Sequence, residues 1–85
     1  MNKEIELKIG QNIKQAREAI KMTQDVLAAK LQLKGCDITR SAIAKIEVGQ
    51  RHLYPDEIIL LKEILCTDFN TLFYGKEETV LPSKK

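Results

Sequence analysis

The sequence predicts an all-α protein that forms one small domain, and three observations support this prediction. Apolar residues recur at helical spacing in segment after segment, residues typical of helix ends separate these segments, and no segment shows the convincing alternation of a strand. A chain of 85 residues has room for one compact core. Its 44% apolar, 31% charged and 5% aromatic residues suit a core of Leu, Ile and Ala. We therefore expect one helical domain over residues 1–75, followed by a flexible tail.

The first two helices are predicted from an apolar stripe and a cap residue. The first helix lies within residues 5–21, and Gly10 is expected to weaken it locally. Thr23 is typical of the cap that precedes a helix, and the second helix then runs to about Leu33. Gly35 closes that helix. The stripe of the first helix consists of Ile5, Ile9, Ile13, Ala16 and Ile20.

Three further helices follow in the same way. Thr39 is predicted to cap a third helix over about residues 39–48, which Gly49 stops. Pro55 suits the first turn of a fourth helix, because the N–H that proline lacks would have no partner there. Asp68 caps a final short helix in FNTLFYG. The tail KEETVLPSKK, residues 76–85, has too little apolar content to fold by itself.

Composition argues against several classes of function. No run approaches the roughly 18 apolar residues of a membrane span, and MNKEIELKIG lacks an apolar signal core, so we expect a cytoplasmic protein. Cys36 and Cys66 have no CxxC spacing and His52 is the only histidine, so neither a metal site nor a disulfide is indicated. An enzyme would need paired carboxylates, a nucleophile with its base or a phosphate-binding glycine loop. We therefore expect no catalytic residue, no cofactor and no small-molecule ligand.

Positive charge is concentrated in the first part of the chain. Residues 1–51 hold ten Lys or Arg against six acids, whereas residues 52–85 hold four against six. This uneven distribution is the footprint that binding to an anionic polymer requires.

The third predicted helix has one apolar arc and one arc with small and basic residues. The small residues let the helix axis approach a partner, and Arg or Lys can donate to guanine O6 and N7 in a major groove about 12 Å wide. Solvation of the surface is the alternative explanation for these charges, but a capped helix, a turn and a capped basic helix in succession favour DNA binding. The core arc holds Ala42, Ile43, Ile46 and Glu47, and the free arc holds Arg40, Ser41, Ala44, Lys45 and Val48.

From about Ile9 to Phe73 the chain resembles the Cro and phage-repressor type of helix-turn-helix, also called the XRE-like family. The resemblance is carried by IGQNIKQAREAIKMTQDVLAAKLQL followed by TRSAIAKIEVGQR, and above all by Arg17, the TQ pair at Thr23, and IxKIExGxR. It implies a five-helix bundle like the DNA-binding domain of lambda repressor, with the helix-turn-helix over about residues 23–48. It also implies a transcriptional regulator, expected to be a repressor, whose partner is double-stranded DNA.

The resemblance also implies the residues that touch DNA. Gln24 matches a glutamine that anchors a phosphate, and the free N–H groups at a helix start favour an anion there. Arg40, Ser41 and Lys45 match positions that contact bases, and Thr39 matches a position near the backbone or an edge base. The whole expected DNA-binding set is Gln24, Lys34, Thr39, Arg40, Ser41, Ala44, Lys45 and Arg51.

Arg17 and Glu47 match a structural ion pair of the family, which joins the first helix to the end of the third. The sequence departs from the family pattern in two places. The segment LKGCDI makes the turn between the second and third helices longer than usual, so it either extends the second helix or forms a small loop near the DNA backbone, with Lys34 available for a phosphate. Val48 replaces a polar residue, and it either touches a thymine methyl or, as we prefer, covers its neighbours.

The fourth predicted helix and its approach carry more apolar residues than one stripe consumes. A protein-interaction module is therefore an alternative class of function, and the same surface is compatible with a DNA-binding homodimer. We expect a homodimer, because one short helix reads only a few base pairs and two half-sites about 34 Å apart give specificity. These apolar residues are Leu53, Tyr54, Ile58, Ile59, Leu60 and Leu61.

Overall fold

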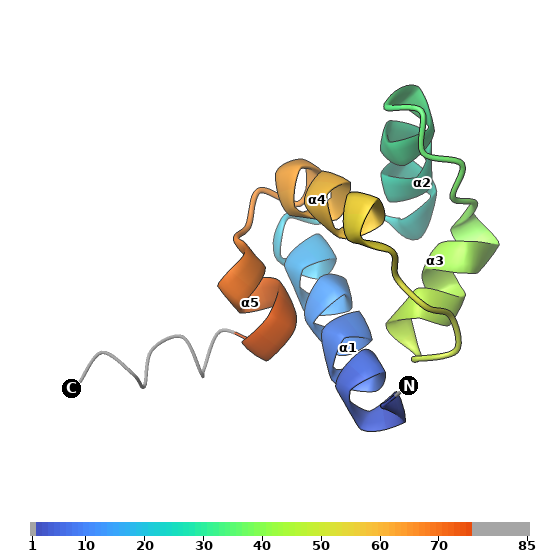
Figure 1. Cartoon of the computed structure of the whole chain (residues 1–85). Helices are drawn as coiled ribbons and strands as arrows, with labels where there is room; N and C mark the ends of the chain where they lie inside the picture. Colours follow the sequence, from blue (N-terminus) through green and yellow to red (C-terminus); the bar gives the residue numbers. More distant parts are fainter. Residues whose placement is uncertain (1, 76–85) are drawn as a thin grey trace.

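The computed structural model describes residues 2–75, which form five helices (Figure 1). Within this range there is no strand, and the predicted all-α five-helix fold is confirmed. No helix in the described part of the chain is long and apolar enough to cross a membrane. The predicted tail, residues 76–85, lies outside the described residues. The helices are α1 (Lys3–Ala19), α2 (Gln24–Leu33), α3 (Arg40–Glu47), α4 (Pro55–Ile64) and α5 (Phe69–Tyr74).

The helices are arranged around α1. Both α3 and α5 pack against α1, and α2 packs against α3 and α4. In Figure 1, α2 and α3 lie together on one side of α1, and α5 lies on the other side. The α2–α3 pair is thus held by α1 and α4 from behind, which leaves an outer face of both helices exposed.

Local capping determines where most helices begin. The side chains of Thr23, Thr39 and Asp68 each accept a hydrogen bond from the backbone N–H three residues later, at 3.1, 3.2 and 2.7 Å. Each such cap stabilises its helix by about 1 kcal/mol. Pro55 occupies the first turn of α4, as predicted. Helix α1 begins earlier than expected, because Asn2 acts as its cap.

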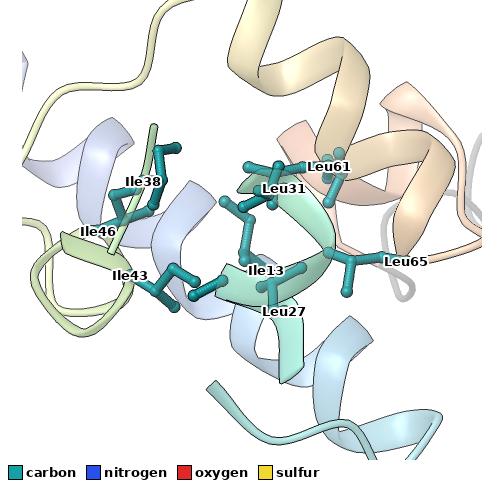
Figure 2. Close-up of a cluster of buried hydrophobic side chains, with 10 residues drawn as sticks. Ile13, Leu27, Leu31, Ile38, Ile43, Ile46, Leu61 and Leu65 are labelled. Carbon is teal, nitrogen blue, oxygen red and sulfur yellow. The ribbon is translucent and has the colours of Figure 1, made fainter. Parts of the chain in front are cut away.

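The core is a single cluster of buried Leu, Ile and Ala side chains. Figure 2 shows its labelled members gathered between the helices, with Ile38 contributed by the connection between α2 and α3. Removing a Leu or Ile side chain of this kind from water stabilises the fold by roughly 1.5 to 3 kcal/mol. The buried apolar residues are Ile13, Leu27, Ala28, Leu31, Ile38, Ile43, Ile46, Leu61, Leu65 and Leu72.

The apolar stripe correctly indicated the helix α1, but its two ends are exposed. Ile13 is 1% exposed, but Ile5 and Ile20 are 56% and 42% exposed. The buried face of α1 contains one isoleucine together with one glycine and two polar residues. The buried residues of α1 are Gly10, Asn12, Ile13 and Arg17.

Gly10 was expected to be a weak point of α1, but it lies where the backbones of α1 and α3 pack closely against each other. A Cβ atom at Gly10 would clash with the carbonyl oxygen of Ile46 and lie 3.1 Å from the backbone of Glu47. These are backbone atoms, which cannot move aside as the tip of a side chain can. The absence of a side chain at Gly10 therefore sets the distance between the two helices.

We predict that Gly10→Ala destabilises the protein by about 2 to 3 kcal/mol, because overpacking outweighs the gain of up to about 1 kcal/mol in helix propensity. Urea unfolding followed by circular dichroism measures this change. Gln11→Ala, at an exposed position in the same helix, is the matched control and should stay within about 0.5 kcal/mol of the unsubstituted protein. A Gly10→Ala variant more stable than the unsubstituted chain would contradict the close approach.

Arg17 and Glu47 form a buried ion pair across the contact between α1 and α3. The arginine Nε and Nη2 atoms donate to the two carboxylate oxygens of Glu47 at 2.8 and 3.1 Å. The two side chains are only 9% and 3% exposed. Arg17 Nη1 also donates to the carbonyl oxygen of Met22 at 2.8 Å, which fixes the turn before α2. The hydrogen bond with Glu47 raises the pKa of Arg17, so the guanidinium stays charged.

We predict that Arg17→Met and Glu47→Leu each destabilise the protein by about 3 to 5 kcal/mol, because each leaves a buried charge without its partner. The double variant should be more stable than either single variant, since it removes both charges together. Unfolding free energies from denaturant titration of the three variants test this expectation. Additive losses in the double variant would show that the two side chains stabilise the fold independently.

Candidate nucleic-acid interface

The connection between α2 and α3 is a loop over residues 34–39 and does not extend α2. Gly35 takes a positive φ of 83°, where glycine is favoured, and the chain then turns back toward the core. Ile38 is 1% exposed, and its carbonyl oxygen accepts a hydrogen bond from Gln32 Nε2 at 3.1 Å. The loop between α2 and α3 is thus attached to the core through Ile38, and it fixes the position of α3 relative to α2.

Helix α3 presents the predicted polar arc outward. Arg40, Ser41 and Lys45 are exposed, while Ala44 is half-buried and so less free than predicted. On the opposite arc Ile43, Ile46 and Glu47 are buried, and Ala42 is half-buried. Val48, the C-cap residue, is 56% exposed, so apolar surface is left open at this end of the helix.

Arg40 is held only weakly by the protein. Its Nε atom lies 3.5 Å from Asp25 Oδ1 on α2, and the two side chains are 64% and 77% exposed. Lys34 is similar, with Nζ 4.0 Å from Glu63 Oε1 and both side chains about half exposed. Ion pairs at the surface contribute about 0 to 1 kcal/mol, so both cations can leave these partners for an anionic ligand. For Lys45 the structure gives no ion pair within residues 2–75.

Thr39 and Arg51 have structural partners in addition to any ligand. The Thr39 hydroxyl oxygen caps α3, which leaves its O–H free to donate. Arg51 makes two hydrogen bonds to the Glu57 carboxylate at 3.0 and 3.1 Å, and a third to the carbonyl oxygen of His52 at 2.8 Å. Arg51 therefore fastens the loop after α3 to the start of α4.

Glu57 has a shifted pKa as a result. Burial acts to raise the pKa of its carboxyl, but hydrogen bonds from Arg51 and from the Tyr54 backbone N–H outweigh burial, and the pKa is lowered from its ordinary value. The carboxylate is thus charged at neutral pH and completes the capping arrangement of α4.

Gln24 lies in the first turn of α2, as expected, but its side chain has a partner that the sequence did not indicate. Its Nε2 atom donates to Glu47 Oε1 at 2.9 Å. Gln24 and Arg40 also border the same surface groove, which runs past the N-terminal end of α2. The structure thus brings the expected phosphate contact and one expected base contact to a single surface.

Among the other residues that line this groove are Lys21 and Asp25, which the sequence analysis missed. Lys21 has a positive φ of 58° just after α1, which places a basic residue beside the start of α2. No motif marks either residue, because their positions depend on the turn between α1 and α2. Their only sequence signal is proximity to the predicted cap at Thr23.

A comparison with known protein families matches residues 13–65 to the helix-turn-helix family. The matched region is more than half of the chain and contains all of α2, α3 and α4. No curated protein and no solved structure matched the chain. The family match agrees with the five-helix fold and with the motif residues of α2 and α3. The chain belongs to the Cro and phage-repressor type of helix-turn-helix family, which is a family of DNA-binding regulators.

Proposed function

We propose that this regulator binds specific sites on double-stranded DNA by placing α3 in the major groove, and that it represses transcription. The observation that carries the proposal is the exposed arc of α3, which holds Arg40, Ser41 and Lys45 and which Arg40 joins to the groove at the N-terminal end of α2. Occupation of a site by this surface would exclude other proteins from the same groove, and repression follows from such exclusion.

The exposed arc is suited to reading bases. Ser41 is small, and so is the half-buried Ala44, so the helix axis can come close to the groove floor. Arg40 lies in the first turn of α3, where a planar guanidinium can donate two hydrogen bonds to a guanine. The weak pair with Asp25 is given up in exchange for this contact. Lys45, more than one turn later, reaches either a base or a phosphate.

The surrounding residues are suited to positioning the protein on the DNA backbone. Gln24 and the first N–H groups of α2 lie at the positive end of a helix dipole, where a phosphate is favoured. Thr39 and Lys34 extend these contacts along the loop before α3. Arg51 supports the loop after α3 through Glu57, and we assign it this indirect role in place of a direct contact.

We propose a homodimer, since one α3 of eight residues reads only a few base pairs. Much of the apolar surface expected on α4 is used inside the protein: Leu61 is buried, and Ile58 and Leu60 are half-buried. The large apolar side chains left most open on α4 and its approach are Tyr54 and Ile59, at 56% and 48% exposure. Action on DNA places the protein in the cytoplasm, associated with the nucleoid when it is bound.

The proposal predicts different responses of Arg40 and Gln24, measured by fluorescence anisotropy with a duplex selected from a random pool. Arg40→Ala should reduce specific binding by about 1 to 3 kcal/mol and relax the preference at one base pair. Gln24→Ala should weaken binding to all duplexes about equally, because phosphate contacts carry no sequence information. Lys8→Ala removes a positive charge from the cavity between α1 and α5, and it is the control for a change of charge alone.

Affinity for the duplex should also fall steeply as salt rises, since bound phosphates release counterions. Folded protein that shows no salt-sensitive binding to any duplex would reject the proposed function. If Gln24→Ala changed the ranking of operator variants and Arg40→Ala did not, the orientation of α3 in the groove would be wrong.

A further inference from the structure

We propose that Glu47 is a positioning residue for DNA binding: it holds the side-chain amide of Gln24 ready for a phosphate, and Arg17 supplies the counter-charge that makes this possible. The inference rests on the proposed function, because it concerns how one of the proposed phosphate contacts is prepared. Glu47 itself is 4% exposed and does not reach the surface where DNA would lie. Its effect on DNA must therefore pass through Gln24.

The hydrogen bond between the two side chains fixes the orientation of the amide. Gln24 Nε2 donates to Glu47 Oε1 at 2.9 Å. A carboxylate only accepts hydrogen bonds, so the NH₂ group of Gln24, and not its carbonyl oxygen, must face Glu47. One N–H is used in this bond, and the second N–H of the same nitrogen stays available for a phosphate oxygen.

Glu47 is itself held firmly, which makes it an effective support. Its two oxygens accept hydrogen bonds from Arg17 at 2.8 and 3.1 Å, and Arg17 is anchored in turn on the carbonyl oxygen of Met22. The order of the Gln24 side chain is thus determined by buried groups on α1 and α3. A long side chain that is already ordered loses less conformational entropy when it binds, and for one such side chain this is equivalent to about a 2- to 10-fold gain in affinity.

Charge neutralisation by Arg17 is a necessary part of this arrangement. A carboxylate next to a phosphate site would repel the ligand if it were alone. The Arg17 guanidinium pairs with both oxygens of Glu47, so the pair carries no net charge. Glu47 can therefore hold Gln24 without adding a net negative charge of its own beside the phosphate site.

A double-mutant cycle in the full 85-residue chain tests the proposal. The variants are Gln24→Ala, Glu47→Gln and the double variant, and the measurement is anisotropy of the selected duplex at one salt concentration. Glu47→Gln replaces a group that only accepts hydrogen bonds by an amide that also donates them, so the orientation of the Gln24 amide is no longer fixed. The variant also adds a net positive charge, which acts in both backgrounds and therefore cancels in the cycle. We expect Glu47→Gln to be about 2- to 10-fold more harmful to affinity when Gln24 is present than when it is absent.

The outcomes separate this inference from the proposed function. An equal effect of Glu47→Gln in both backgrounds overturns the positioning role, although duplex binding by the unsubstituted chain remains. Loss of salt-sensitive duplex binding in the unsubstituted chain overturns the proposed function and the positioning role with it. Circular dichroism at the temperature of the titration verifies that each variant is folded.

A second measurement does not depend on a stable Glu47→Gln protein. It uses the unsubstituted chain, and Gln24→Ala serves only to assign the side-chain amide resonance of Gln24. Nuclear magnetic resonance of the side-chain amides in the unsubstituted chain should show Gln24 Nε2–H protected from exchange with water. Gln15, an exposed glutamine on α1, is the matched reference and should exchange freely. When duplex is added, one Gln24 proton should stay bonded to Glu47 while the other shifts. A Gln24 amide that exchanges as fast as that of Gln15, or that leaves Glu47 on binding, overturns the proposal.

Discussion

The buried ion pair between Arg17 and Glu47 is the interaction on which the rest of the structure depends. Through these two side chains four parts of the chain meet: α1, the turn at Met22, the start of α2 at Gln24, and the end of α3. The pair has room to form because Gly10, on the same face of α1, lets the α3 backbone come close. Geometry at the proposed DNA surface is thus set by the buried contacts of Arg17 and Glu47.

The proposed DNA surface and its support differ in how strongly they are held. Behind the surface, the Arg17–Glu47 and Arg51–Glu57 pairs each have two hydrogen bonds and largely buried carboxylates. On the surface, Arg40 meets Asp25 at 3.5 Å with both side chains exposed. A rigid support keeps α2 and α3 in fixed register, while weakly held side chains can exchange an internal partner for DNA. A DNA-binding surface needs both properties: the helices must stay in place, and the side chains that contact DNA must be able to move.

Features that depend on local chemistry could be predicted from the sequence. The caps at Thr23, Thr39 and Asp68 depend on residues three positions apart, and the exposed arc of α3 follows from its helical period. Contacts between distant segments could not be predicted in this way. From the sequence, Gly10 is predicted only to weaken α1, whereas in the structure it allows α3 to pack closely. Ile38 is predicted only to be part of a loop, whereas in the structure it is buried in the core. The hydrogen bond from Gln24 to Glu47 spans 23 positions and leaves no local pattern.

Methylation protection on the selected duplex tests the central claim, that α3 lies in the major groove, most directly. Dimethyl sulfate methylates guanine N7 in the major groove and adenine N3 in the minor groove, so it reports on both grooves in one reaction. We expect protection of guanine N7 within each half-site, lost at one guanine in Arg40→Ala, with adenine N3 still reactive. Protection of adenine N3 together with unprotected guanine N7 would contradict it.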